Sequence, residues 1–173
     1  MSQLSIDDLH TQVLYPVTRV RAGNAGGSGI IIYSQPDTKV PNEYISLILT
    51  CQHVIDSCVK IKDDWDPVLR KNRKTDFFEE VTVEIFEYVN SKVVSSNATQ
   101  ATIVSYDKHH DLAILRLNNP FPMKHIARII PRTEINKLRI GDEVWTSGCS
   151  LLHDPFPNSG TITYLREMIE QKS

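Results

Sequence analysis

The sequence predicts an all-β protein whose antiparallel strands form a sandwich or a barrel. Short runs rich in β-branched residues recur along the chain and are divided by Gly, Pro, Asn and Asp, a spacing typical of such folds. No segment of about 10 to 15 residues with helical periodicity lies between successive runs, which disfavours a parallel sheet built from β-α-β units. The predicted strands are residues 17–20, 30–33, 44–50, 81–88, 101–104, 112–117, 144–145 and 161–164.

The segments between and around these strands divide the chain into four parts. Ser5 and Asp8 have the spacing of a helix N-cap with acid in the first turn, which predicts a short helical arm over residues 1–12. Strand texture begins at Val13, and the first barrel is assigned to residues 13–118. Residues 119–140 show no strand alternation and predict a linker, so that residues 141–173 begin a second barrel.

A charged stretch interrupts the first barrel at residues 63–80. It mixes acidic and basic side chains around Trp65 and the pair Phe77-Phe78. The stretch is either an inserted lobe or a long surface loop, and the favoured interpretation is a solvated loop held by a few aromatic anchors.

Composition excludes several classes of partner. The chain has 173 residues, 40% of them hydrophobic and 23% charged, with a formal net charge of −2. Such a balance is ordinary for one soluble domain with a real core, and it lacks the field of one sign that nucleic acid or an anionic membrane would require. We therefore expect neither nucleic acid nor a membrane as the main partner.

The apolar runs and the cysteines indicate the compartment. The longest apolar runs, such as residues 45–50 and 112–117, are far shorter than the roughly 20 residues of a membrane helix. The first eight residues lack the basic and then apolar character of a secretory signal, and three cysteines are an odd number for a disulfide framework. The expected location is cytoplasmic.

A histidine and an aspartate carry the chemistry. His53 follows the apolar strand 44–50, whose end would deliver its ring to a barrel rim, and Asp111 directly precedes the strand 112–117. A carboxylate next to a strand that is apolar on both faces would be partly buried and would need a hydrogen-bonding partner such as an imidazole N–H. Pairing fixes the imidazole tautomer, so that the other ring nitrogen accepts a proton from a nucleophile.

These motifs resemble those of the trypsin-fold (chymotrypsin-like) serine peptidases, in particular the high-temperature-requirement (HtrA/Deg) branch. Residues 27–32 (Gly-Ser-Gly-Ile-Ile-Ile) resemble the glycine turn into the second strand of the family, and residues 50–54 (Thr-Cys-Gln-His-Val) resemble its histidine motif. Residues 101–117, ending in Asp-Leu-Ala-Ile-Leu-Arg-Leu, resemble the aspartate motif, and residues 141–148 the opening strand of the second barrel. The resemblance extends from about Val13 to Leu165.

The resemblance implies a complete first trypsin-like barrel, a partial second barrel and serine endopeptidase chemistry. His53 would be the general base and acid, and Asp111 its orienting partner. Hydrolysis would proceed through an acyl-enzyme on an extended or unfolded polypeptide, with no metal and no organic cofactor.

The sequence departs from the family at the nucleophile. The family serine lies in a Gly-x-Ser-Gly-Gly turn whose backbone N–H groups form the oxyanion hole, and no such turn occurs in the 173 residues. The weak candidates are Ser147, Cys149, Ser150 and Ser159. We therefore expect a truncated chain that is inactive alone, because residual catalysis in triad mutants depends on the oxyanion hole. An incomplete second barrel would also expose strand edges that invite self-association or the missing strands.

Two classes of alternative remain open. The first alternative is a metal site, because sulfur and imidazole ligands occur in clusters. The spacing, however, is not a paired Cys-x-x-Cys framework, and neighbouring residues at a strand end point to opposite sides. No structural zinc is therefore expected. Cys51 and Cys58 are instead predicted to be buried, and His109 and His110 to form an exposed turn, with a role in shaping the substrate cleft left open. The ligand types considered are Cys51, His53, Cys58, His109, His110, Cys149 and His153.

The other alternative keeps the fold and drops the reaction. A trypsin-fold module without catalysis could bind a peptide or another subunit along a strand edge. A third possibility is a split enzyme, in which another chain supplies the missing strands and the serine.

Overall fold

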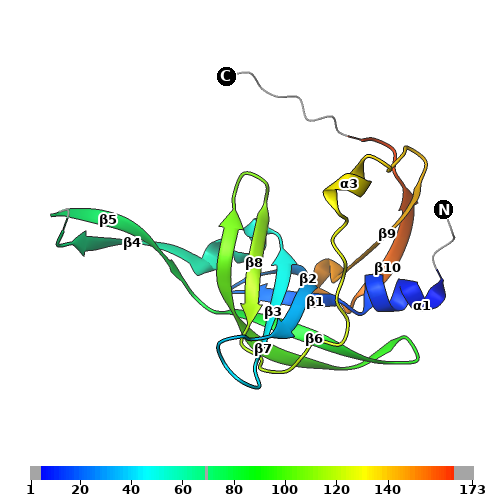
Figure 1. Cartoon of the computed structure of the whole chain (residues 1–173), viewed down its shortest axis with the longest axis horizontal. Coiled ribbons are helices and arrows are strands. Elements are labelled where there is room, and N and C mark those ends of the chain that lie inside the picture. The colour runs from blue at the N-terminus through cyan, green and yellow to red at the C-terminus, as the bar shows by residue number, and fades with distance from the viewer. Residues whose placement is uncertain (1–4, 69, 166–173) are drawn as a thin grey trace.

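The core of the molecule is a closed barrel of six antiparallel strands. The computed structural model describes residues 5–68 and 70–165. In the barrel the strands follow one another in the order β1-β2-β3-β8-β7-β6 (Figure 1). Their bounds are β1 Val17–Ala22, β2 Ala25–Pro36, β3 Tyr44–Thr50, β6 Val81–Val89, β7 Lys92–Asp107 and β8 Leu112–Leu117. The prediction of an all-β fold with a complete antiparallel first barrel is confirmed.

Alternation along the strands fills the barrel with small and branched side chains. In β3 and β8, every second residue is buried, and Ile48 and Leu115, which face each other in the β3–β8 register, have no exposed surface. Because successive side chains of a strand point to opposite faces, this alternation places one face of each strand in the core. The fully buried residues also include Val20, Val81 and Val83.

The glycines at the start of β2 do not form the predicted turn. The turn lies earlier, at Gly23 and Asn24, and Gly27 and Gly29 already pair with β1 inside β2. The residues are glycines because the interior is tight at this point: a Cβ on Gly29 would lie 2.7 Å from Ile48 and 2.8 Å from the Thr18 hydroxyl. The absence of a side chain is therefore a requirement of packing.

Replacing Gly29 by alanine is expected to destabilise the barrel. The added methyl would overpack the core, which typically costs about 1–3 kcal/mol of unfolding free energy. Gly160, whose Cβ would meet nothing within 4 Å, is the matched control, and its replacement by alanine should change stability far less. Urea denaturation of both variants measures the difference, and equal stability of the two variants would contradict the packing argument.

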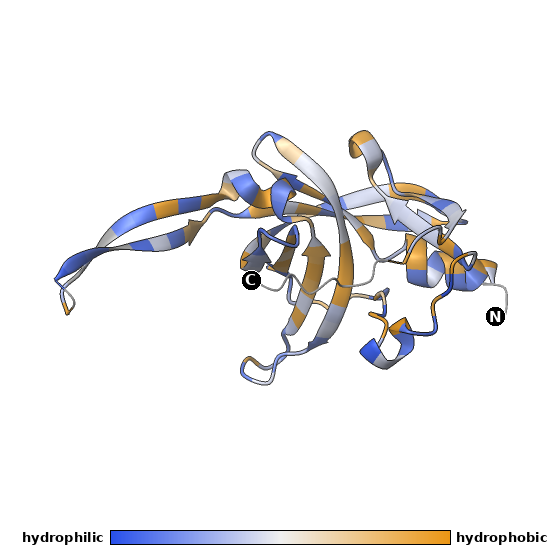
Figure 2. Cartoon of the chain, turned by 90° about the horizontal axis from the view of Figure 1, so that it is seen from above, coloured by the Kyte–Doolittle hydropathy of each residue, from blue (hydrophilic) through white to orange (hydrophobic). Residues whose placement is uncertain are grey.

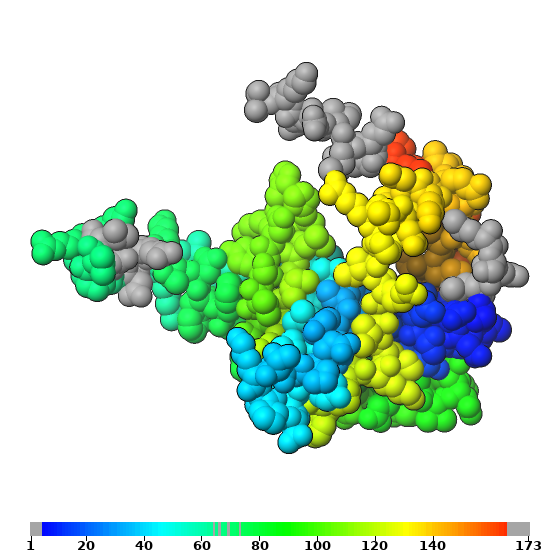
Figure 3. All heavy atoms as spheres, viewed as in Figure 1, coloured from blue at the N-terminus to red at the C-terminus, as the bar shows by residue number. Residues whose placement is uncertain are grey.

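A two-stranded hairpin stands away from the barrel, where a surface loop was favoured. Strands β4 (Val59–Asp66) and β5 (Lys71–Phe78) pair along their whole length, and the hairpin projects from the body of the molecule (Figures 2 and 3). The loop prediction was wrong because backbone pairing between the two segments outweighs their charged composition. Only the base has an aromatic anchor: Phe78 packs against the barrel core, whereas Trp65 is 59% exposed.

The N-terminal arm is helical, as predicted, although its helix changes type. Ser5 caps α1 (Ile6–Asp8), and its hydroxyl accepts a hydrogen bond from the Asp8 backbone N–H at 3.0 Å. The chain then continues as a π-helical segment, η1 (Leu9–Leu14), which ends two residues beyond the predicted arm. Residues 1–4 lie outside the described part of the chain.

The predicted linker is held against the barrel. Between β8 and the next strand the chain forms a single short helix, α3 (Arg132–Ile135), among residues 119–142. The backbone N–H of Met123 donates to the Ser34 hydroxyl at 3.0 Å, and that of Ala127 donates to the Ile31 carbonyl at 2.8 Å. These bonds hold the linker beside β2, and Met123 and Ile126 pack against the barrel core.

Beyond the linker, the described chain adds a separate two-stranded sheet. It consists of β9 (Glu143–Gly148) and β10 (Phe156–Thr161), with the 3-10 turn η3 (Ser150–Leu152) between them. The prediction of a strand at 161–164 was wrong, because pairing with β9 places Pro157 and Gly160 in strand β10 despite their low strand propensity. Proline is tolerated in such a strand because the strand lies at a sheet edge.

A charged cluster joins this sheet to the barrel. Arg19 on β1 binds the Glu84 carboxylate on β6 and also donates to the Leu152 carbonyl at 2.7 Å, and Arg21 binds the same carboxylate. The side chains of Arg19 and Glu84 are each 12% exposed. Burial raises the pKa of Glu84, but the hydrogen bonds and charges of the two arginines outweigh this effect and hold the pKa below its usual value.

Glu84 is therefore expected to make stability depend on pH. Because its pKa is lower in the folded chain than in the unfolded chain, ionised Glu84 stabilises the fold above the ordinary value of 4.5, and this contribution is lost as the pH falls towards the folded pKa. Replacing Glu84 by glutamine should cost about 1.5–3 kcal/mol at neutral pH, the range for hydrogen bonds to charged groups, and less at acid pH. Urea titrations across the pH range measure this. A difference that stays constant at acid pH, or that also appears for Glu143→Gln on the exposed face of β9, would contradict it.

No helix among the described residues is long and apolar enough to cross a membrane.

Candidate active site

His53 lies on a short helix that begins where β3 ends. Cys51 leaves the strand in an extended conformation, and α2 (Gln52–Ile55) follows. The helix turns Val54 and Ile55 into the core, where they are 4% and 0% exposed, and leaves the side chain of His53 70% exposed. The helix therefore directs the imidazole towards solvent at the rim of the barrel, as the position after an apolar strand predicted.

Asp111 reaches the same point from the β7–β8 turn. Its backbone φ is 54°, in the left-handed region, which aspartate tolerates better than most residues because its side chain is short and polar. Two residues later, Ala113 pairs with Thr50 at the end of β3. Strand pairing therefore brings the two motifs together although they are 58 positions apart.

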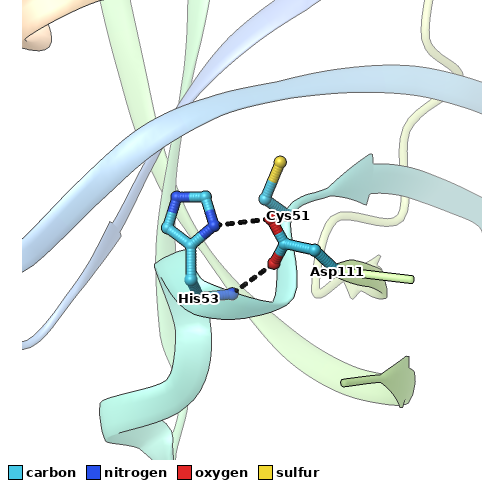
Figure 4. A group of neighbouring side chains, drawn as sticks. All are labelled: Cys51, His53 and Asp111. Atoms are coloured by element: carbon cyan, nitrogen blue, oxygen red, sulfur yellow. Dashed lines mark hydrogen bonds and ion pairs between the residues drawn. The ribbon is translucent and has the colours of Figure 1, made fainter. Parts of the chain in front are cut away.

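The Asp111 carboxylate binds His53 twice (Figure 4). One oxygen, Oδ1, accepts a hydrogen bond from the His53 backbone N–H at 2.9 Å, and the other, Oδ2, lies 2.7 Å from ring nitrogen Nδ1. The bond from the backbone N–H, followed by that from the ring, lowers the pKa of Asp111. An ionised carboxylate only accepts hydrogen bonds, so Nδ1 carries the hydrogen and Nε2 keeps its lone pair.

Asp111 is partly buried, as expected for a residue that directly precedes strand 112–117. About half of its side chain, 47%, is exposed, so the carboxylate is reached both by His53 and by solvent.

Cys51 is a third residue at this site, and the prediction of its burial was wrong. It was predicted to be buried, but it is exposed, and its sulfur lies beside Asp111 (Figure 4). Although the residue is exposed, its thiol is partly desolvated, which raises the pKa of the thiol, and the negative charge of Asp111 raises this pKa further. The expectation that neighbouring residues point to opposite sides fails because the strand stops at Thr50 and α2 begins. Cys58, in contrast, is buried as predicted, at 3% exposed.

The four candidate nucleophiles lie elsewhere, and none has a hydrogen bond to His53 in the described part of the chain. Ser159 is exposed within β10, and Ser150 is exposed in η3. The Ser147 hydroxyl is buried without a partner. Cys149 is 2% exposed, its thiol lies 3.6 Å from the Thr18 carbonyl, and burial raises its pKa to about 11, so it stays a thiol at neutral pH.

The predicted turn before Asp111 contains a second pair of the same kind. His109 and His110 are exposed in the turn, as expected, and Asp107 accepts hydrogen bonds from both of their backbone N–H groups. The Asp107 carboxylate also lies 2.6 Å from His110 Nδ1, and the side chains are 50% and 65% exposed. The pair stabilises the turn and lacks a cysteine.

The structure thus combines a closed six-stranded antiparallel barrel with a histidine and an aspartate that contact each other at its rim. A protein-family model described as "Trypsin-like peptidase domain" matches residues 27–172 of the chain. The chain belongs to the trypsin-like peptidase family.

Solved structures with the same fold include proteases of the HtrA/Deg type. Deg5 superposes with a TM-score of 0.61 at 18% identity over 95% of this chain, and the MamO protease domain from Magnetospirillum magneticum with a TM-score of 0.54 at 18% identity over 89%. A serine endoprotease from Yersinia pestis gives a TM-score of 0.56 at 19% identity over 95% of this chain. The matched region spans 65%, 62% and 46% of those three chains respectively. No curated protein sequence matches at a significant level.

Proposed function

We propose that the chain provides the histidine and the aspartate of a serine endopeptidase, with His53 as general base and acid and Asp111 as its orienting partner. The observation that carries the proposal is the double hold of one carboxylate on His53, through the backbone N–H and through ring Nδ1. Two bonds from one rigid turn fix both the position and the tautomer of the ring, which is the requirement for a general base.

In the proposed reaction, Nε2 of His53 takes the proton of an attacking serine hydroxyl. The Asp111 carboxylate stabilises the imidazolium that forms, and the proton then passes to the leaving amine as the acyl-enzyme appears. Water deacylates the enzyme by the same route. The 70% exposure of the His53 side chain leaves Nε2 accessible to a hydroxyl and to the substrate.

We further propose that the 173 residues alone do not hydrolyse peptides. The chain contains no Gly-x-Ser-Gly-Gly turn, and the thiol of Cys149 is buried and protonated. Without a nucleophile and its oxyanion donors, the oriented imidazole has no group to activate. The nucleophile of the proposed enzyme therefore comes from polypeptide other than these residues.

Intact-mass measurement combined with fluorophosphonate labelling tests this proposal. The 173-residue chain should show no covalent adduct, whereas protein from the natural source should contain a form with a labelled serine outside residues 1–173. Labelling of that form should be lost in His53→Ala and retained in His110→Ala, the matched change in the second histidine-aspartate pair. An adduct on Ser147, Ser150 or Ser159 of the 173-residue chain would contradict the proposal, as would labelling that does not depend on His53.

A second candidate is a trypsin-fold module that binds a strand without catalysis. It is favoured by the β9–β10 sheet, which among the described residues has only two strands and carries exposed apolar side chains, including Trp145 at 36% and Phe156 at 48%. An added strand, from a peptide or from a second copy of the chain, would pair with the open edge. Absence of any labelled serine in the natural protein, together with peptide binding that Phe156→Ser weakens, would favour this module.

A further inference from the structure

Three different metal-binding atoms meet at the rim of the barrel. The sulfur of Cys51, a ring nitrogen of His53 and a carboxylate oxygen of Asp111 all lie within 4.8 Å of one another, and they form the only such group of three among the residues that the structure describes (Figure 4). Cys51 directly precedes α2, His53 lies in the first turn of this helix, and Asp111 faces them from the β7–β8 turn. Two separate elements of the barrel therefore converge on one point.

The donor types suit a zinc ion, and their spacing needs adjustments of up to about 1 Å to reach a tetrahedral site. Thiolate, imidazole and carboxylate bind Zn²⁺ at about 2.3, 2.0 and 2.1 Å, so tetrahedral ligands lie roughly 3.3–3.8 Å apart. Binding would replace the Nδ1–H···Oδ2 hydrogen bond, lengthening that distance from 2.7 Å by about 0.6 Å, and the Cys51 sulfur would move inward by rotation about its side-chain bond. Three protein ligands leave a fourth position for water, as in open zinc sites.

The surroundings support binding without a rearrangement of the barrel. Oδ2 is the ligand atom, and Oδ1 keeps its hydrogen bond from the His53 backbone N–H, which would orient the carboxylate as an outer-shell partner. Cys51 is the exposed cysteine of the chain, whereas the thiols of Cys58 and Cys149 are buried. The Cys51, His53 and Asp111 side chains are all at least partly exposed, so an ion approaches the cluster from solvent.

We propose that Cys51, His53 and Asp111 form a zinc site that holds His53 in a state unable to act as a base. The Cys51 thiol releases its proton to solvent as it binds the metal. The metal takes Nδ1, so the single hydrogen of the neutral ring moves to Nε2, the nitrogen that must be free to accept a proton. Zinc also removes Asp111 from the ring by taking its Oδ2. The inhibitory role rests on the proposed peptidase function, while the zinc site itself does not.

Zinc binding is measured by competition with a chromophoric chelator, on protein without a histidine tag. Cys51→Ser should weaken Zn²⁺ affinity at least tenfold, since loss of an outer-shell partner alone commonly costs about 10–100-fold. His110→Gln removes an exposed histidine from the pair that has no cysteine, and it should leave the affinity unchanged. Co²⁺ bound to the wild type should show a thiolate charge-transfer band that is absent in Cys51→Ser.

Equal affinity in the wild type and Cys51→Ser, or loss of affinity in His110→Gln, would overturn the site. Circular dichroism of each variant without metal, and a second ligand variant, Asp111→Asn, distinguish loss of a ligand from loss of the fold. Weaker binding by both ligand variants, with unchanged spectra, would support the site.

Long-range ¹H–¹⁵N NMR of the His53 ring tests the inhibitory state. Without metal, Nδ1 should carry the hydrogen, and with one equivalent of Zn²⁺ the hydrogen should be on Nε2. Metal bound through Nε2 would overturn the proposed inhibition. These readouts need no catalytic activity, so failure of the peptidase proposal would appear in the fluorophosphonate experiment and would leave the zinc affinities unaffected.

Discussion

Replacing Asp111 by asparagine is expected to invert the tautomer of His53. The His53 backbone N–H would still bind the amide oxygen, which leaves the amide NH₂ facing Nδ1. An NH₂ group donates, so Nδ1 becomes the acceptor and the hydrogen moves to Nε2. In the peptidase-active form of the proposed enzyme, this change should reduce turnover about 10⁴-fold, as the same substitution does in the general triad mechanism.

NMR of the His53 ring measures the tautomer in the 173-residue chain, and steady-state hydrolysis measures the turnover in the active form. Asp107→Asn is the matched control, because it makes the same change beside His110. It should invert the tautomer of His110 and leave both that of His53 and the turnover unaltered. Equal losses of turnover in the two variants would show that neither carboxylate is specific to the reaction.

Replacing Leu115 by alanine is expected to cause the largest loss of stability of any change described above. Leu115 has no exposed surface and lies in the centre of β8, opposite Ile48 of β3. Truncating a buried leucine to alanine removes its transfer free energy and leaves a cavity, which together cost about 2–5 kcal/mol. Urea denaturation followed by circular dichroism gives the difference in unfolding free energy.

Leu112 provides the control on the same strand. It opens β8 with 45% of its surface exposed, so Leu112→Ala should change the unfolding free energy by only about 0.5 kcal/mol. A similar loss in both variants would mean that position in the strand, and not burial in the barrel, determines the cost.

The barrel strands were predictable where local preference and burial agree. β3 and β8 have the predicted bounds, because both are largely apolar runs that begin directly after an acidic residue. β10 and the β4–β5 hairpin were not predictable, because pairing with the neighbouring strand holds residues whose own strand preference is low. Long strands were also underestimated: β7 spans residues 92–107 although only 101–104 have a strong strand pattern.

In the candidate site, the contact between His53 and Asp111 was predictable, because a partly buried carboxylate needs a hydrogen-bond donor and the imidazole N–H provides one. The exposure of Cys51 was not, since it depends on the residue at which β3 gives way to α2, a boundary that composition does not define. The left-handed backbone at Asp111 was not predictable either, because aspartate adopts it only in particular turns.

Both bonds that orient the His53 ring arise from strands β3, β7 and β8 and the turns that join them. The position and the tautomer of the imidazole are therefore determined within the first barrel. Because neither bond involves a residue beyond 118, sequence change in the later polypeptide affects the imidazole only indirectly, through packing against the barrel, where Met123 and Ile126 contact the core.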